Sequence, residues 1–315
     1  MNSPRIAVVG ATGAVGTVAL RLLRERGYEN VRAFASARSA GRELGGITVE
    51  EATPEALSAG GIDLALFSVG TSASRELVPH AVDGGALVVD KSSAYRLADG
   101  YPLVVPEVNG ERARDALETT RVVANPNCST IPLTCVLKPL HEAVGLHAVR
   151  VSTYQAVSGA GAQRMEQLRA EHPADHDLAF DWTWEGDETD EEAKIRAEGR
   201  KIMELPDLPI SATTVRVPVL VGHSQSVWIK TEDAISPEQA TALLEAAPGV
   251  RLVDTPTSRA AAQTEDVLVG RIRPDHASDR GGLVLFLACD NLVKGAALNA
   301  IQIAELLLEP ARAAA

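Results

Sequence analysis

Short apolar runs alternate with amphipathic helical stretches along the first 125 residues. The runs are rich in β-branched residues and include RIAVVG, VRAFAS, DLALFS, ALVVD and RVVAN. Between them lie segments with the apolar spacing of a helix, such as VGTVALRLLRERG and SRELVPHAVDGG. Strands that alternate with helices form βαβ units, so this pattern predicts an α/β domain with a parallel, doubly wound sheet.

From His147 onward the strand-like runs are longer, and fewer helices separate them. HAVRVSTYQAV, ATTVRVPVLV, SVWIKTED and GLVLFLACDN are typical of an antiparallel or mixed sheet. We therefore predict a first domain over residues 1–127 and a second over residues 128–290. The final segment, KGAALNAIQIAELLLE, is strongly amphipathic and must bury its apolar face against other elements.

One segment is compositionally biased. DWTWEGDETDEEAK, residues 181–194, is acidic and lies just before a predicted helix. Thr189 and Glu192 have the spacing of a capping box, and acids in a first turn suit the helix dipole. As a group, these acids are interpreted as a solvated loop followed by a helix start.

Composition excludes several classes of partner. A chain of 315 residues with 45% hydrophobic residues is long enough for two domains. The net charge of −12 and the lack of a Lys/Arg cluster argue against nucleic-acid binding, so anionic ligands would be held by a few placed cations. The chain has no apolar run of about 18 residues, and its start runs directly into a strand pattern. We expect a cytoplasmic protein without a membrane segment.

The three cysteines are Cys128, Cys135 and Cys289. This odd number, without metal-ligand spacing, predicts neither a disulfide framework nor a metal site. A reducing compartment would keep Cys128 available as a thiol.

The stretch VVGATGAVG, residues 8–16, follows the first strand and opens the first helix. Gly10 permits a tight turn, Gly13 lets the backbone approach a pyrophosphate, and Gly16 allows close packing of helix on strand. This context predicts a Rossmann-type dinucleotide-binding domain, although a plain glycine-rich turn is the alternative. The predicted contacts to the cofactor come from Gly10, Thr12, Gly13, Ala14, Val15 and Gly16.

The second strand ends in ASARSAG, where a site that prefers NAD usually carries Asp or Glu against the ribose hydroxyls. Ser36, Arg38 and Ser39 offer hydroxyls and a guanidinium instead, which suit a 2′-phosphate. We therefore predict NADP as the cofactor.

Cys128 lies in NPNCST, where a strand gives way to a helix. Backbone N–H groups and the positive end of the helix dipole favour a thiolate there, but free cysteines are often buried and inert. The position of Cys128 alone therefore does not decide between a reactive nucleophile and a buried structural thiol. Cys135 and Cys289 lie in apolar runs and are expected in the core.

A thiol nucleophile needs a group that exchanges protons near neutrality, and histidine is the usual choice. Of the seven histidines, His223 stands out because RVPVLVGHSQS sets it after Gly222 at the turn between two strong strands. Arg216 enters the same turn from the strand side.

Seven motifs, in this order, closely resemble the aspartate-β-semialdehyde dehydrogenase family over nearly the whole chain. They are GATGAVG, DKSSAYR, VVPEVN, NPNCST, TYQAVSGAG, RVPVLVGHS and DNLVKGAALNAIQIAE. The resemblance implies reversible reduction of β-aspartyl phosphate by NADPH to aspartate β-semialdehyde and phosphate, on the route to lysine, threonine and methionine. It also implies a mixed-sheet α+β second domain for catalysis and dimerisation, a homodimer, and a terminal helix, within residues 291–315, that returns to the first domain.

The resemblance assigns roles to particular residues. Cys128 is the nucleophile that forms a thioester, Gln155 orients the substrate, and His223 is the acid/base catalyst. Arg216 would bind the α-carboxylate, Glu191 the amino group, and Lys194 and Arg96 the phosphate. Asn127 is expected near the tetrahedral oxyanion. Ser158 and Gly159 are expected near the nicotinamide, and Asn291 and Gly295 near the cofactor.

Two of these assignments have plainer alternatives. Glu191 and Lys194 share a helix face at a spacing of three residues, which also fits an ordinary surface ion pair. SGAG, residues 158–161, also fits a plain turn. Because residues 170–190 are more acidic than in the family, the choice of Glu191 over Glu192 depends on the local register.

Two alternative functions share features with this sequence. N-acetyl-γ-glutamyl-phosphate reductase shares the fold plan and the cysteine–histidine chemistry, but its His-x-His-type signature is missing from this sequence. A non-catalytic NADP-binding sensor would have no reason to retain Cys128, Gln155, Arg216 and His223 together.

Overall fold

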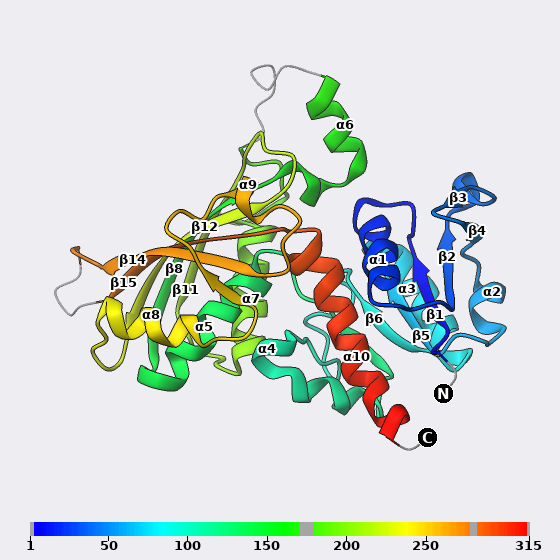
Figure 1. The fold of residues 1–315 in the computed structure, drawn as a ribbon, viewed down its shortest axis with the longest axis horizontal. Coiled ribbons are helices and arrows are strands. Elements are labelled where there is room, and N and C mark those ends of the chain that lie inside the picture. The colour runs from blue at the N-terminus through cyan, green and yellow to red at the C-terminus, as the bar shows by residue number, and fades with distance from the viewer. Residues whose placement is uncertain (1–2, 171–178, 278–281, 314–315) are drawn as a thin grey trace. The chain divides into compact units, whose positions relative to one another are not determined.

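The chain forms two compact units, described here from a computed structural model (Figure 1). Unit 1 comprises residues 1–126 and 296–315, and unit 2 comprises residues 127–295. The structure describes residues 3–170, 179–277 and 282–313. The chain leaves unit 2 after Gly295 rather than at residue 290, because Asn291 is hydrogen-bonded inside unit 2 to Ser158 and to the N–H of Gly222.

Unit 1 is built on a sheet with the strand order β3-β4-β2-β1-β5-β6-β7. Every neighbouring pair is parallel except β3 with β4. Because the order runs outward from β1 in both directions, the predicted doubly wound parallel sheet is confirmed. Its strands are β1 (Ile6–Val9), β2 (Val31–Ala35), β3 (Glu43–Leu44), β4 (Ile47–Glu51), β5 (Leu64–Phe67), β6 (Leu87–Asp90) and β7 (Val122–Ala124).

The core of unit 1 lies between this sheet and its helices. Phe34, Phe67 and Leu57 are fully buried in one apolar cluster together with residues of α3. The helices are α1 (Ala14–Glu25), α2 (Pro54–Ser58), α3 (Thr71–Asp83), α4 (Pro106–Asn109) and α10 (Leu298–Ala313), with 3₁₀ turns η1 (Ala37–Ser39) and η2 (Gly110–Ala116). Helix α10 packs on η2, β6 and α1, and Asn299 donates from Nδ2 to the carbonyl of Val104 and to Asn125 Oδ1.

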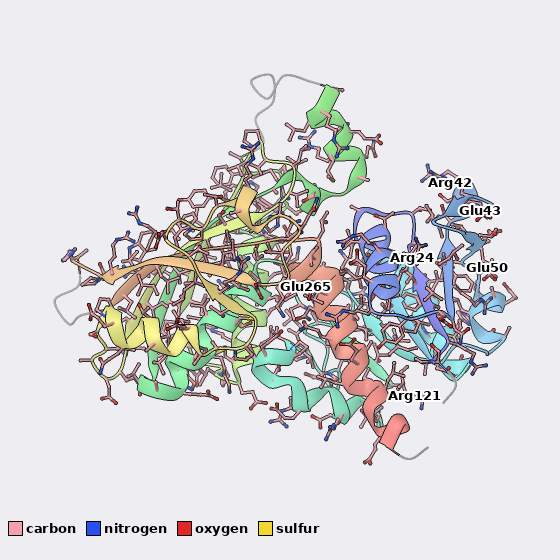
Figure 2. The ribbon with its side chains drawn as sticks, in the orientation of Figure 1. Arg24, Arg42, Glu43, Glu50, Arg121 and Glu265 are labelled. Carbon is pink, nitrogen blue, oxygen red and sulfur yellow. The ribbon has the colours of Figure 1, made fainter. Side chains whose placement is uncertain are left out.

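Charged side chains line the β3–β4 edge of the unit 1 sheet, where Figure 2 labels Arg42, Glu43 and Glu50. Glu50 accepts two hydrogen bonds from the guanidinium of Arg32, at 2.8 and 2.6 Å. Strand β3 has only two residues. A short, charged edge strand resists pairing with other chains.

Unit 2 contains a mixed sheet with the order β11-β8-β12-β15-β14-β13. The pairs β11–β8 and β13–β14 are parallel and the others are antiparallel, which confirms the predicted mixed sheet. The strands are β8 (Leu146–Gln155), β11 (Ile210–Arg216), β12 (His223–Thr231), β13 (Val250–Leu252), β14 (Val267–Pro274) and β15 (Leu283–Cys289), with a separate hairpin of β9 (Trp184–Glu185) and β10 (Glu188–Thr189).

Helices α5, α7 and α8 pack on one face of this sheet (Figure 1). The helical elements of unit 2 are η3 (Val157–Ala160), α5 (Thr130–Val144), α6 (Ala162–Ala170), α7 (Asp190–Met203), α8 (Pro237–Glu245) and α9 (Ser258–Ala261). The π-helical turn η5 (Val293–Ala297) begins in unit 2 and ends in unit 1. The predicted capping box at the start of α7 is confirmed, because Thr189 and Glu192 exchange side-chain to backbone hydrogen bonds. Of the acidic segment ahead of α7, residues 171–178, which include His172 and His176, lie outside the described residues.

None of the helices in the described parts of the chain combines the length and the apolar character needed to cross a bilayer.

The core of unit 1 gives a direct stability prediction. Phe34→Ala removes a fully buried ring and should lower the free energy of unfolding by about 3–5 kcal/mol in urea titrations. Leu97→Ala, at a position of the same unit that is 52% exposed, serves as the control and should change it by less than about 0.5 kcal/mol. Equal losses in the two variants would contradict the assignment of Phe34 to the core.

Candidate active site

The glycine loop of unit 1 has the geometry of a phosphate cradle. Gly10 has a φ of 89°, and a Cβ there would collide with the carbonyl of Ser68. A Cβ on Gly16 would collide with the carbonyl of Gly10, so this glycine lets α1 pack against the loop. Gly13 is the N-cap of α1 and makes no side-chain cap, so a bound anion can meet the first amides of the helix. Thr12, Ala14 and Val15 lie in the same loop and helix start. The residues present therefore fit a dinucleotide.

The end of β2 carries no acid against a ribose. Ser36 is the N-cap of η1, and its side chain makes no capping hydrogen bond. Arg38 and Ser39 lie within η1, and Arg38 is exposed. Hydroxyls and a guanidinium thus stand at the position where the sequence predicts a 2′-phosphate.

Three predicted residues meet at one end of the unit 2 sheet. Gln155 ends β8, Arg216 ends β11 and His223 begins β12. Arg216 is the register partner of Gln155, and Ser224 is that of Tyr154. Parallel strands β8 and β11 end where antiparallel β12 begins, so segments far apart in the sequence bring these side chains together.

Cys128 lies immediately before Ser129, the N-cap of α5. It therefore precedes the helix, unlike Cys135, which is buried within it. The Cys128 sulfur Sγ lies 3.2 Å from His223 Nε2. Cys135 and Cys289 are buried as predicted, and burial, as the main cause, raises the pKa of the Cys289 thiol well above its usual value.

The protonation state of His223 is set by the hydrogen bond at Nδ1, the ring nitrogen that faces away from Cys128, and by burial of the ring. The N–H of Ala156 donates to His223 Nδ1 at 3.0 Å, so Nδ1 is an acceptor and the proton of the neutral ring resides on Nε2. Burial, with a smaller effect from the positive charge of Arg216, lowers the pKa of His223 from 6.5 to about 3. At neutral pH the imidazole is uncharged and offers Nε2–H to the sulfur.

Arg216 is held in place from several sides. Its Nη1 donates to the carbonyl of Ala156 at 3.1 Å, and its Nε pairs with Asp181 at 3.1 Å. The guanidinium carbon lies 4.4 Å from the ring centre of Trp182. Because Asp181 and Trp182 belong to the acidic segment, at least these two of its residues contribute to the site rather than to a solvated loop.

Gly159 lies directly beside these groups. A Cβ at Gly159 would come within 3.1 Å of Arg216 Nη1 and 3.3 Å of His223 Nε2. The missing side chain leaves the approach to both groups open. Gly295 likewise leaves space beside Cys128, because a Cβ at position 295 would come within 3.1 Å of Cys128 Cβ.

Of the two adjacent glutamates, Glu191 is the one that faces this site. Its Oε1 accepts from Gln155 Nε2 and from Asn127 Nδ2, both at 2.9 Å. Glu192 instead accepts the N–H groups of Thr189 and Thr214. Lys194 lies on the same helix face as Glu191, 3.6 Å from its Oε2, and also pairs with Asp190 at 2.6 Å.

Three other predicted residues are buried and hydrogen-bonded, two in unit 2 and one in unit 1. Ser158 and Asn291 are buried in unit 2 and hydrogen-bonded to each other, so Asn291 ties the start of η5 to η3. Arg96 is buried in unit 1 and donates to the carbonyls of Asn125 and Lys91.

Sequence reasoning missed two buried polar residues that hold the loop around Cys128. Glu198 accepts the N–H of Asn127 at 2.6 Å, and Gln225 donates to the Ser129 carbonyl at 2.7 Å. Gln155, which the sequence did identify, also donates to Ser129 Oγ. Two weak signals were available. Glu198 follows Glu191 by seven residues on one helix face, and Gln225 follows His223 by two on one strand face.

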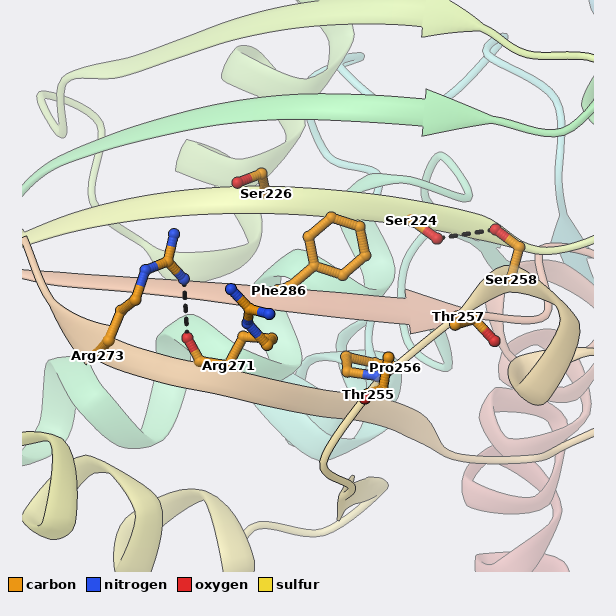
Figure 3. Close-up of a pocket in the computed structure, with 9 residues that line it drawn as sticks. All are labelled: Ser224, Ser226, Thr255, Pro256, Thr257, Ser258, Arg271, Arg273 and Phe286. Atoms are coloured by element: carbon orange, nitrogen blue, oxygen red, sulfur yellow. Dashed lines mark hydrogen bonds between the residues drawn. The ribbon is translucent and has the colours of Figure 1, made fainter.

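A cavity of about 410 Å³ lies on the opposite face of β12 (Figure 3). Its wall includes Ser224 and Ser226, whose side chains alternate with those of His223 and Gln225. Ser224 Oγ lies 2.8 Å from Ser258 Oγ. The cavity contains neither the cysteine nor the histidine and is separate from the site described above.

Comparison with known proteins agrees with this geometry. The model described as "Semialdehyde dehydrogenase, NAD binding domain" matches residues 5–116, and "Semialdehyde dehydrogenase, dimerisation domain" matches residues 137–183 and 180–294. The aspartate-semialdehyde dehydrogenase of Corynebacterium melassecola is 47% identical over 96% of this chain and 99% of its own length. The chain belongs to the aspartate-semialdehyde dehydrogenase family.

Other members of the aspartate-semialdehyde dehydrogenase family agree in sequence and in structure. The enzyme of Aquifex aeolicus is 43% identical over 97% of this chain and 98% of its own. The crystal structure of Vibrio cholerae aspartate semialdehyde dehydrogenase II complexed with ASA superposes with a TM-score of 0.92, at 36% identity over 98% of this chain and 99% of that one. These relatives favour neither N-acetyl-γ-glutamyl-phosphate reductase nor a non-catalytic sensor. The chain is therefore an oxidoreductase with a nicotinamide-nucleotide-binding domain.

The lowered pKa of His223 predicts a pH effect on stability. The unfolded chain takes up a proton at this residue below about pH 6.5, while the folded chain does not until about pH 3. The free energy of unfolding should therefore fall as the pH drops from 6.5 toward 3, through this residue alone. Urea titrations at several pH values should show that His223→Asn, which cannot titrate, loses less stability over this range than the wild type. Parallel losses in both proteins would contradict a neutral, buried His223.

Proposed function

We propose that this enzyme reduces β-aspartyl phosphate to aspartate β-semialdehyde and phosphate with NADPH, reversibly, through a thioester on Cys128. The observation that carries the proposal is the 3.2 Å approach of Cys128 Sγ to His223 Nε2. A cysteine within hydrogen-bond reach of a histidine is the signature of an activated thiol nucleophile.

The first step needs a thiolate. The Cys128 thiol first loses its proton to solvent. Because Nδ1 of His223 accepts the N–H of Ala156, Nε2 of the neutral ring already carries a proton. His223 therefore acts in this step as a hydrogen-bond donor that stabilises the thiolate, rather than as the acid/base catalyst that the resemblance implies. The Cys128 thiolate attacks the carbonyl carbon of the acyl phosphate, the C–S bond forms, and the C–O bond to phosphate breaks. Phosphate leaves with the electron pair of that bond.

The second step reduces the thioester. When bound, the reduced nicotinamide supplies the hydride that adds to the thioester carbon. The C–S bond then breaks, and the sulfur leaves as a thiolate that again accepts the hydrogen bond of His223. A thiolate is a better leaving group than an alkoxide, which is why the chemistry requires cysteine rather than serine.

Charged residues of the site suit the substrate's polar groups. We assign the α-carboxylate to Arg216, whose guanidinium can form forked contacts, and the ammonium group to Glu191. Gln155 bonds to Glu191 and orients the substrate beside Cys128. Lys194 and Arg96 are assigned to the phosphate. Asn127 is already bonded through its side chain to Glu191 and to the N–H of Ser129, so it supports the site through these contacts.

We further propose NADP as the cofactor and a homodimer as the functional assembly. Ser36, Arg38 and Ser39 are the residues suited to the 2′-phosphate. Ser158 and Gly159 are assigned to the nicotinamide, and Asn291 and Gly295 to the cofactor. The Candida albicans relative, which is 25% identical with a TM-score of 0.78, has been crystallised with NADP. The matched dimerisation-domain model supports the homodimer. We also propose a cytoplasmic location, where reducing conditions would keep Cys128 as a thiol.

An activity assay tests the proposed reaction. The absorbance of the reduced nicotinamide should report NADPH formation when aspartate semialdehyde and phosphate are supplied, and Cys128→Ser should lose about 10³-fold or more of kcat while retaining NADP binding. Cys135→Ser is the matched control and should remain active. Robust activity only on the N-acetylglutamate semialdehyde analogue would overturn the proposal, as would substantial turnover by Cys128→Ser.

The nucleotide preference has its own test. Arg38→Ala should raise the KM for NADP by about 10-fold or more, the value of a charge-assisted contact, and leave the KM for NAD nearly unchanged. Arg42→Ala, which alters another cation of the same region, is the control. Equal efficiency of the wild type with both nucleotides would contradict the preference.

A further inference from the structure

The residues on either side of Cys128 are fastened by hydrogen bonds at every polar group that the structure describes for them. For Asn127, the N–H donates to Glu198, Nδ2 donates to Glu191, and Oδ1 accepts from the N–H of Ser129. For Ser129, Oγ accepts from Gln155 and the carbonyl accepts from Gln225. Cys128 is thus held between two immobilised neighbours.

Glu198 is the buried anchor on the α7 side. It is 1% exposed, and its Oε2 accepts the N–H of Asn127 at 2.6 Å. A carboxylate removed from water costs free energy unless hydrogen bonds compensate it, and bonds to a charged acceptor are short and strong. Because Glu198 shares a helix face with Glu191 and Lys194, one rigid helix carries both the polar residues of the site and the contact to the loop ahead of Cys128.

Gln225 is the anchor on the β12 side. It is fully buried, and its Nε2 donates to the carbonyl of Ser129 at 2.7 Å. It lies two residues after His223 on the same face of the same strand. Strand β12 therefore fixes the imidazole directly and the segment after the sulfur through Gln225.

We propose that Glu198 and Gln225 are positioning residues for Cys128, which hold its sulfur in line with Nε2 of His223. The proposal rests on the proposed function, in which Cys128 is the nucleophile. Neither residue touches the reacting atoms, and each acts through the backbone of a neighbour of Cys128. A misplacement of about 1 Å in a reactive geometry can cost about 100-fold in rate, so the loss of either anchor should act on kcat.

Four variants test the role. Glu198→Leu removes the acceptor and leaves the N–H of Asn127 unpaired, whereas Glu198→Gln keeps an oxygen that can accept it. Gln225→Met keeps length but loses the donor. Glu192→Leu is the matched control, because Glu192 is also buried on α7 and also accepts backbone N–H groups, but those of Thr189 and Thr214.

The expected pattern separates positioning from folding. Glu198→Leu and Gln225→Met should lower kcat by about 10- to 100-fold with little change in the KM for the nucleotide, and Glu198→Gln should recover to within about threefold of the wild type. Glu192→Leu should lower Tm yet keep the wild-type kcat per folded molecule. Wild-type kcat in Glu198→Leu or Gln225→Met, or a Glu198→Gln variant as slow as Glu198→Leu, would overturn the proposal.

Alkylation gives a readout that does not depend on turnover. The rate at which iodoacetamide modifies Cys128, with buried Cys135 as the internal reference, should fall in Glu198→Leu and Gln225→Met and recover in Glu198→Gln. If Glu198→Leu does not fold, Gln225→Met still tests the proposal, because unchanged alkylation and kcat in that variant would refute the role of Gln225. A wild type without aspartyl activity refutes the proposed function, whereas an active wild type with unaffected variants refutes the positioning alone.

Discussion

The hydrogen bond from the Ala156 N–H to Nδ1 of His223 is the constraint on which the chemistry of the site depends. It makes Nδ1 an acceptor and leaves the proton on Nε2, which lies 3.2 Å from the Cys128 sulfur. Burial lowers the pKa of the imidazole to about 3, so the ring stays neutral at physiological pH. A neutral donor can stabilise a thiolate before attack and again when sulfur leaves, which is what the proposed mechanism asks of His223.

The surrounding fold serves to hold these two side chains in register. Three strands of the mixed sheet bring Gln155, Arg216 and His223 to one end, and helix α7 brings Glu191 and Glu198 against the loop that carries Cys128. Glycines at 159 and 295 keep the approach free of side chains. Rigid elements rather than a flexible loop thus support the site, which favours a preorganised geometry.

Much of this could be predicted from the sequence. The alternation of apolar runs and helices predicted the parallel sheet of unit 1, and the longer runs after His147 predicted the mixed sheet of unit 2, because the period of apolar residues reflects burial on a strand or helix. The motif around Cys128 and the turn at His223 identified two residues that the structure brings into contact. Glu198 and Gln225 escaped detection because isolated buried polar residues carry only a weak spacing signal, and their partners are backbone groups of a distant loop. The contribution of Asp181 and Trp182 to the surroundings of Arg216 was hidden for a similar reason, since the acids there looked like a solvated segment.

The thioester on Cys128 is the central claim, and mass spectrometry can test it directly. Aspartate semialdehyde and the oxidised nucleotide, supplied without phosphate, should leave an aspartyl group on the enzyme, because the second half of the reverse reaction cannot proceed. Fragmentation of the peptide that contains both Cys128 and Cys135 should locate the added mass on Cys128 only. An adduct on any other residue, or turnover with phosphate from an enzyme that never accumulates the adduct on Cys128, would contradict the account.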